Sequence, residues 1–93
     1  MQLVDIDIDR LATMLKALSH PVRLDMVRTL GDCGDRQCND LTRELSLAQS
    51  TVSEHLRVLK EAGIIEQCGP GARAAYCLKK DALLWLKQSI IAL

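Results

Sequence analysis

Apolar residues recur at steps of three and four positions in the first part of the chain. In the stretch DIDRLATMLKALS this period, which is that of an amphipathic helix, places four side chains on one face: Ile8, Leu11, Leu15 and Leu18. Pro21 interrupts the pattern and suits the first turn of a second helix, PVRLDMVRTL, which Gly31 is expected to end. The pattern therefore predicts two consecutive helices, the first over about residues 8–18.

Two further helical patterns follow the loop GDCGDR. In CNDLTRELS the apolar positions one turn apart are Leu41 and Leu45. In QSTVSEHLRVLKEAG the same spacing continues until a glycine ends the run, and its apolar positions are Val52, Leu56 and Leu59. These two short helices, separated by a few residues, predict a helix-turn-helix over about residues 38–62.

The spacing changes after Gly63. The runs IIEQC and AAYCL, separated by GPGAR, predict a two-stranded hairpin over about residues 64–78. The last stretch, KKDALLWLKQSIIAL, predicts a helix over about residues 80–92 that has almost no polar face, so it needs burial on more than one side. A core helix is one interpretation. A helix shared between two subunits is favoured, because a chain of 93 residues buries only roughly 60–65% of its surface alone.

Charge and composition narrow the functional classes. Twelve basic and twelve acidic side chains give a net charge of zero, which argues against bulk electrostatic coating of nucleic acid or membrane but permits a local basic patch. No run approaches the roughly 18 apolar residues of a membrane helix. The first ten residues, MQLVDIDIDR, carry three aspartates and lack the features of a secretory signal. We expect one soluble cytoplasmic domain over residues 1–93, with no membrane partner.

Helix, turn, helix and hairpin follow one another in the order of a winged helix-turn-helix, whose second helix enters the DNA major groove. If the apolar positions of that helix face the core, the opposite surface at 100° per residue carries Ser50, Ser53, Glu54, Arg57 and Glu61, with Thr51 at its edge. Small hydroxyl residues at a helix start suit close approach to base edges and phosphates. The alternative is an ordinary solvated face.

Four more residues are candidates for DNA contact. Gln49 offers a bidentate partner for adenine, and Arg57 offers one for guanine or phosphate. Arg73, at the hairpin tip, suits a minor-groove or backbone contact. His55 lies beside the buried stripe, and its neighbours one turn away are not metal ligands. We therefore expect His55 to pack or to contact phosphate rather than bind metal.

Three stretches, LKALSHPVRLDMVRTL, LTRELSLAQSTVSEHLRVLKEAGII and GARAAYCL, resemble the ArsR/SmtB family of bacterial winged helix-turn-helix repressors over about residues 11–78. The resemblance implies a mainly α fold of about five helices with a hairpin wing. It also implies a homodimer built on the first and last helices, bound to a two-fold DNA operator and released by an inducer. It places Gln49, Ser50, Ser53 and His55 at or near DNA. Nothing in the chain matches a nucleophile, base and oxyanion arrangement, so we expect no enzyme.

The chain departs from the family at two kinds of position. Ala48 stands where the family often has a serine that caps the recognition helix, and the loss of that cap should cost about 1 kcal/mol. Metal-sensing members bind ions at two places, and neither is complete here. The last helix offers Asp81 without histidine, and Gln37 and Asn39 stand where the third-helix site has cysteines.

The four cysteines remain open to two interpretations. Two disulfides of a secreted domain are disfavoured because no signal peptide is visible. Cys38 begins the third predicted helix, where the helix dipole and nearby Arg36 favour the thiolate, and Cys33 is its nearest partner in sequence. A complete site for As(III) or another thiophilic ion would need a further thiol, from Cys68 or Cys77 or from a second subunit. In the other interpretation the cysteines are structural or incidental, and no cofactor is certain.

Two functional classes follow from these patterns. The first is a sequence-specific repressor released by a thiol-reactive or thiophilic inducer, such as As(III), Sb(III), a soft metal, reactive sulfur or an oxidant. The second is a winged-helix module for protein interaction or thiol buffering that never reads DNA sequence. Stronger binding to a symmetric duplex than to a scrambled one separates the two classes.

Overall fold

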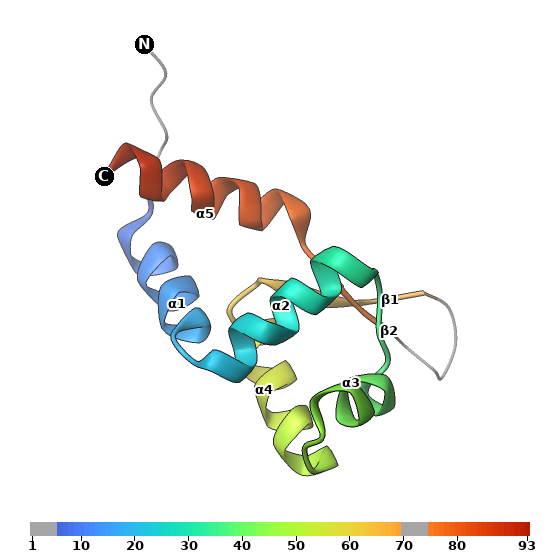
Figure 1. The fold of residues 1–93 in the computed structure, drawn as a ribbon. Helices are drawn as coiled ribbons and strands as arrows, with labels where there is room; N and C mark the ends of the chain where they lie inside the picture. Colours follow the sequence, from blue (N-terminus) through green and yellow to red (C-terminus); the bar gives the residue numbers. More distant parts are fainter. Residues whose placement is uncertain (1–5, 70–74) are drawn as a thin grey trace.

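The computed structural model describes residues 6–69 and 75–93, and Figure 1 shows their arrangement. The elements, in chain order, are α1 (Ile8–Leu18), α2 (Pro21–Cys33), α3 (Cys38–Leu45), α4 (Gln49–Glu61), β1 (Ile65–Cys68), β2 (Ala75–Leu78) and α5 (Lys80–Ala92). The predicted fold class, five helices with a two-stranded hairpin, is confirmed. Within the described residues, no helix combines the length and the apolar character that crossing a membrane requires.

The second helix continues past the glycine that was expected to end it. Gly31 lies inside α2, and Gly34 forms the C-cap instead, with a φ of 85° and its N–H donating to the Leu30 carbonyl at 3.2 Å. Glycine adopts this left-handed conformation without steric cost, so Gly34 rather than Gly31 suits the helix end. The prediction for Gly31 was therefore wrong by three positions.

The core is formed by buried residues of all five helices and of the start of the hairpin. The three apolar residues predicted to face inward on α4, Val52, Leu56 and Leu59, are at most 1% exposed. On α1 the buried residues are Leu11, Met14 and Ala17, whereas Ile8 and Leu15 are on the outside. The other buried apolar residues are Met26, Leu30, Leu41, Ile64, Ile65, Ala82 and Leu86.

The hairpin is held at the start of its first strand and along one edge of its second. β1 begins directly after α4 at the buried pair Ile64 and Ile65, and the Ile64 carbonyl accepts the Lys79 N–H at 2.9 Å. The loop between α2 and α3 pairs with the free edge of β2, because Arg36 and Tyr76 exchange backbone hydrogen bonds of 3.1 and 2.7 Å. The α2–α3 loop is therefore joined to the edge of β2 by an isolated antiparallel bridge.

The helix α5 packs on α1, at the end of the molecule away from α3 and α4 (Figure 1). Its side toward the core carries Ala82, Leu86 and Ser89, and the Arg10 guanidinium of α1 lies 4.1 Å from the Trp85 ring centroid. Several large apolar side chains of the two helices are exposed: Ile8, Leu15, Leu84, Ile90 and Ile91, with Leu93 after them. An apolar surface therefore crosses both terminal helices.

Candidate nucleic-acid interface

The start of α4 is exposed and has no side-chain cap. Ala48 occupies the N-cap position with φ −65° and ψ 147°, and no side chain accepts a hydrogen bond there, as the sequence predicted. Four predicted DNA-contacting residues are exposed around this helix start: Gln49, Ser50, Thr51 and Ser53. The uncapped N–H groups carry the positive end of the helix dipole, which suits a phosphate oxygen.

Arg57 is held on the outer face of α4 by two carboxylates of its own helix. It forms ion pairs with Glu54 at 2.5 Å and with Glu61 at 2.8 Å, and all three side chains are exposed. The hydrogen bond from Arg57 lowers the pKa of Glu54, so this carboxylate stays ionised near neutral pH. The group of three therefore has a net negative charge, and Arg57 would exchange at least one ion pair if it contacted a base or phosphate.

A hollow separates α4 from the wing and is lined by both. Its residues are Ser50, Ser53, Glu54, Leu56, Arg57 and Lys60 of α4, together with Tyr76 of β2. Gln67 connects the two sides, because its carbonyl oxygen accepts from Lys60 at 3.1 Å and its amide donates to the Tyr76 hydroxyl at 3.5 Å. Sequence reasoning missed Tyr76, although the alternation of side chains along β2 could have placed it on the face opposite Cys77.

His55 is half-buried and joins α4 to the start of α2. Its Nδ1 lies 3.2 Å from an Arg23 guanidinium nitrogen, and its ring centroid lies 4.5 Å from that of His20. Burial, followed by the charges of His20 and Arg23, lowers the pKa of His55, so Nδ1 of a neutral ring accepts from Arg23. His55 is therefore packed against neighbouring side chains, which was one of its two expected roles. Its contact with phosphate stays a prediction.

Arg23 is a connecting residue that sequence reasoning missed. Besides His55 it contacts the Ala17 carbonyl near the end of α1, to which its Nε donates at 2.5 Å. His20 begins the same helix, since its Nδ1 accepts the Val22 N–H at 3.1 Å. No local pattern could pair residues 32 positions apart, such as Arg23 and His55. The remaining predicted DNA contact, Arg73, lies outside the described residues.

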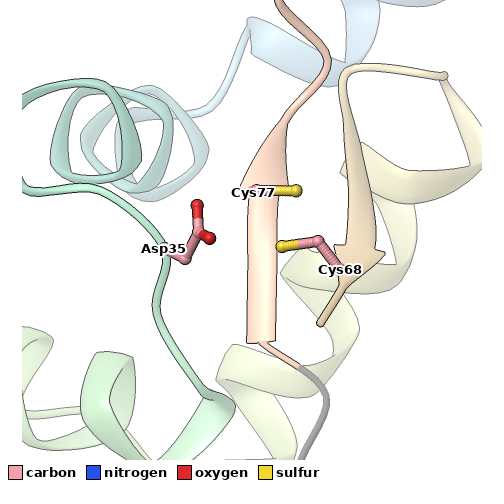
Figure 2. Close-up of side chains that lie close together, drawn as sticks. All are labelled: Asp35, Cys68 and Cys77. Atoms are coloured by element: carbon pink, nitrogen blue, oxygen red, sulfur yellow. The ribbon is translucent and has the colours of Figure 1, made fainter. Parts of the chain in front are cut away.

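All four cysteines are free thiols, and they lie in two separate places. Cys33 ends α2 and is exposed, whereas Cys38 begins α3 and packs half-buried against the core. Figure 2 shows the second place, where Cys68 and Cys77 of the hairpin lie beside Asp35 of the α2–α3 loop. Among the described residues, these three form the group close enough to hold a metal ion, with ligand atoms within 4.8 Å of one another.

Comparison with known proteins decides the family. The sequence model for bacterial regulatory proteins of the arsR family matches residues 20–67. The chain belongs to the arsR family. This family consists of regulators rather than enzymes, so the expectation of no enzymatic activity is confirmed together with the family resemblance.

Known relatives and solved structures of the arsR type extend the match. The biofilm growth-associated repressor of Xylella fastidiosa is 43% identical over 58 residues, which are 62% of this chain and 50% of the relative. The chain thus matches about half the length of that relative. The crystal structure of the transcriptional repressor BigR from Xylella fastidiosa is 36% identical with a TM-score of 0.70, covering 89% of this chain and 83% of BigR.

A third comparison concerns assembly. The homodimeric winged helix-turn-helix DNA-binding domain of Mb0332 from Mycobacterium bovis, solved by NMR as fragment 1–100, is 26% identical with a TM-score of 0.75. The match covers 91% of this chain and 80% of that domain. The arrangement of five helices and a wing is therefore shared with a domain that is described as homodimeric.

Proposed function

We propose that this arsR-family chain is a sequence-specific transcriptional repressor that reads DNA through the start of α4. One observation carries the proposal: an uncapped, exposed helix start bears Ser50 and Ser53 beside the hollow that α4 shares with the wing. Small hydroxyl side chains allow the helix to approach base edges, and the free N–H groups suit phosphate. Repression is the activity named for the Xylella fastidiosa relatives.

The DNA partner is proposed to be an operator of two-fold symmetry, bound by a homodimer. Apolar side chains exposed on α1 and α5 favour a second copy of the same surface as their cover, because a two-fold pair buries one patch twice. Such a pair presents two copies of α4 to successive major grooves, about 34 Å apart along one face of the duplex. The homodimeric Mycobacterium bovis neighbour supports this assembly.

The test begins with selection of bound duplexes from a random pool, followed by fluorescence anisotropy of the selected and a scrambled duplex. We expect the wild-type chain to prefer the selected duplex and its affinity to fall as salt increases. Replacing Ser50→Ala together with Ser53→Ala should reduce binding to the level of the scrambled duplex. The dimer and its melting temperature should hardly change, since both side chains are exposed.

Thr13→Ala is the matched control for this pair, because Thr13 is an exposed helical hydroxyl on α1. It should bind the selected duplex like the wild type. Equal affinity of the double variant and the wild type would remove the assignment of α4 as reader. Failure of the wild type to prefer any duplex would favour a protein-interaction or thiol-buffering module instead.

The inducer is proposed to be thiophilic or thiol-reactive: As(III), Sb(III), a soft metal ion, reactive sulfur or an oxidant. The cytoplasm, where thiols stay reduced, is the compartment in which such a sensor would work. Cys38 supports one version of this proposal, because it begins the helix that positions α4, and exposed Cys33 lies five residues before it.

Single variants separate the thiols. If the inducer acts through Cys38, the Cys38→Ser variant should bind operator like the wild type and should remain bound when an inducer is added. Cys33→Ser, Cys68→Ser and Cys77→Ser tested in the same anisotropy assay identify any other thiol that is required. Normal release of the Cys38→Ser variant would exclude Cys38 as the sensor.

A further inference from the structure

We propose that Asp35, Cys68 and Cys77 bind a thiophilic divalent cation such as Zn²⁺ or Cd²⁺. Their ligand atoms all lie within 4.8 Å of one another. In Figure 2 the two sulfurs lie between the strands, and the Asp35 carboxylate is seen across β2 from them. Two thiolates and a carboxylate are a donor set that such ions accept. The site lies outside both positions that the family resemblance implied.

The register of the hairpin brings the two thiols together. Cys68 is paired with Ala75 and Cys77 with Glu66, so the two cysteines are diagonal neighbours on one face. The backbone pairing of Arg36 with Tyr76 then holds the α2–α3 loop against the edge of β2, which places Asp35 beside the thiols. Three separate segments of the chain therefore converge on the site.

The geometry favours a metal ion over a disulfide. Diagonal neighbours in an antiparallel pair are roughly 7–8 Å apart, beyond the usual Cα separation of about 4.4–6.8 Å in a disulfide. A tetrahedral ion with metal–sulfur bonds of about 2.3 Å holds two sulfurs about 3.8 Å apart. The side chains would need to approach by only about 1 Å, and water can fill the fourth position.

Protonation makes the site sensitive to pH. A divalent ion must displace thiol protons, and its affinity should therefore increase as pH increases. A divalent ion that replaces two protons leaves the total charge unchanged. Any effect on DNA affinity must therefore come from a change in the positions of residues.

The site is connected to α3 through Arg36 and to α4 through Tyr76. Arg36 donates to Glu44 of α3 at 2.9 Å, and Tyr76, on the opposite face of β2 from the thiols, lines the hollow with α4. An ion that draws the thiol face toward Asp35 should pull Tyr76 away from α4. Resting on the proposed function, we infer that the bound ion weakens operator binding.

The binding test is a Cd²⁺ titration of the reduced, metal-free full chain, followed by thiolate-to-cadmium absorption in the ultraviolet and by melting temperature. We expect one ion per chain, the absorption of two thiolates and a higher melting temperature. Cys68→Ser and Cys77→Ser should each lower the affinity at least tenfold and remove about half of the absorption.

Two further variants make this test selective. Asp35→Asn should keep the full absorption of bound Cd²⁺ while lowering the affinity roughly 10- to 100-fold. Asp32→Asn changes an exposed carboxylate of α2 outside the cluster and should match the wild type. Melting temperatures without metal identify any variant that fails to fold. Wild-type affinity in both hairpin variants, or loss of binding in Asp32→Asn, would overturn the site.

The regulatory part is tested by anisotropy of labelled operator with and without Cd²⁺. We expect Cd²⁺ to weaken operator binding by the wild type roughly 5- to 150-fold and to leave binding by Cys77→Ser unchanged. Unchanged operator affinity in a Cd²⁺-loaded wild type would overturn the regulatory link while the site stands. If the metal-free chain prefers no duplex, the proposed function fails, and the absorption test still decides the site.

Discussion

At the scale of single residues, His55 shows how a side chain on the reading helix serves the rest of the fold. It accepts from Arg23, which also donates to the Ala17 carbonyl, and its ring contacts that of His20. The end of α1 and the middle of α4 are thereby connected through one guanidinium. A charged His55 would repel Arg23, so the connection depends on a neutral ring.

The stability of the chain should therefore depend on pH through His55. Its pKa is lowered in the folded chain, so between that value and about 6.5 the unfolded chain binds more protons. The stabilisation is fully present above about pH 6.5 and is lost as the pH falls through the folded-state value. The melting temperature should therefore increase from pH 5 to about pH 6.5, and His55 should add no further increase between pH 6.5 and pH 8.

His55→Gln is the matched variant for this prediction, because a neutral amide can still accept from Arg23. Its melting temperature should vary less with pH than that of the wild type in the same range. An identical pH dependence in both proteins would show that His55 does not contribute, despite the neighbouring His20, Arg23 and Glu54.

Residue-level prediction from the sequence succeeded where one element determines the environment. The helical period alone identified Val52, Leu56 and Leu59 as buried. The same period could have predicted the ion pairs of Arg57, because Glu54 and Glu61 lie three and four positions away. From the sequence, Arg57 was considered only as a DNA partner, and that role stays a prediction. Contacts such as Arg23 with His55 need the assembled fold.

At the scale of elements, the start of α4 lacks the stabilising side-chain cap that a helix start can have. Ala48 has the extended backbone of an N-cap residue but supplies no acceptor for the first-turn N–H groups. The neighbouring α1 does have such an acceptor, since the Asp7 carboxylate accepts the Arg10 N–H at 3.0 Å. Side chains also cap the starts of α2 and α3, whereas α5, like α4, has no side-chain cap. The helix proposed to meet DNA therefore keeps donors available that α1, α2 and α3 satisfy with side chains.

Ala48→Ser should stabilise the free chain by about 1 kcal/mol, because its hydroxyl can accept a first-turn N–H. Urea denaturation followed by circular dichroism measures this change. Ala12→Ser, at an exposed position inside α1, is the control and should destabilise slightly, since serine is a weaker helix former than alanine. No gain in Ala48→Ser would mean that another group already satisfies this helix start.

At the scale of the whole molecule, α1 and α5 carry exposed apolar side chains that no other part of the described chain covers. Leu84 is 55% exposed and Ile91 is 85% exposed, whereas Ala82 and Leu86 on the same helix are buried. One side of α5 thus completes the core, and another side is available to a second subunit. The sequence offered a core helix and a helix shared between subunits as alternatives, favoured the second, and could not assign residues to either use.

These two sides of α5 should respond differently to change. Leu84→Ser with Ile91→Ser should give a folded chain that sediments as a monomer and binds operator weakly. Removal of residues 82–93 should instead give an aggregating or unfolded chain, because it also deletes core residues. Sedimentation and circular dichroism distinguish these results, and Lys87→Ser, an exposed polar position of α5, should remain like the wild type.

A stable monomer after the truncation would contradict the role of α5 in the core. A dimer of undiminished strength in the double variant would contradict the role of α5 in assembly.

The sequence could not predict which residues far apart along the chain come together. Cys68 and Cys77 were recognised as strand residues, but Asp35 joins them only because the α2–α3 loop pairs with β2.

The two faces of β2 have a consequence for insertions and deletions in this chain. Tyr76 is directed to the hollow beside α4, and Cys77, the next residue, is directed to Cys68 and Asp35. Because side chains alternate along a strand, a shift of pairing by one residue would exchange these two faces. An insertion or deletion that moves β2 by one position would expose the thiols to α4 and turn the tyrosine outward. Length changes around β2 should therefore be tolerated only where they preserve this alternation.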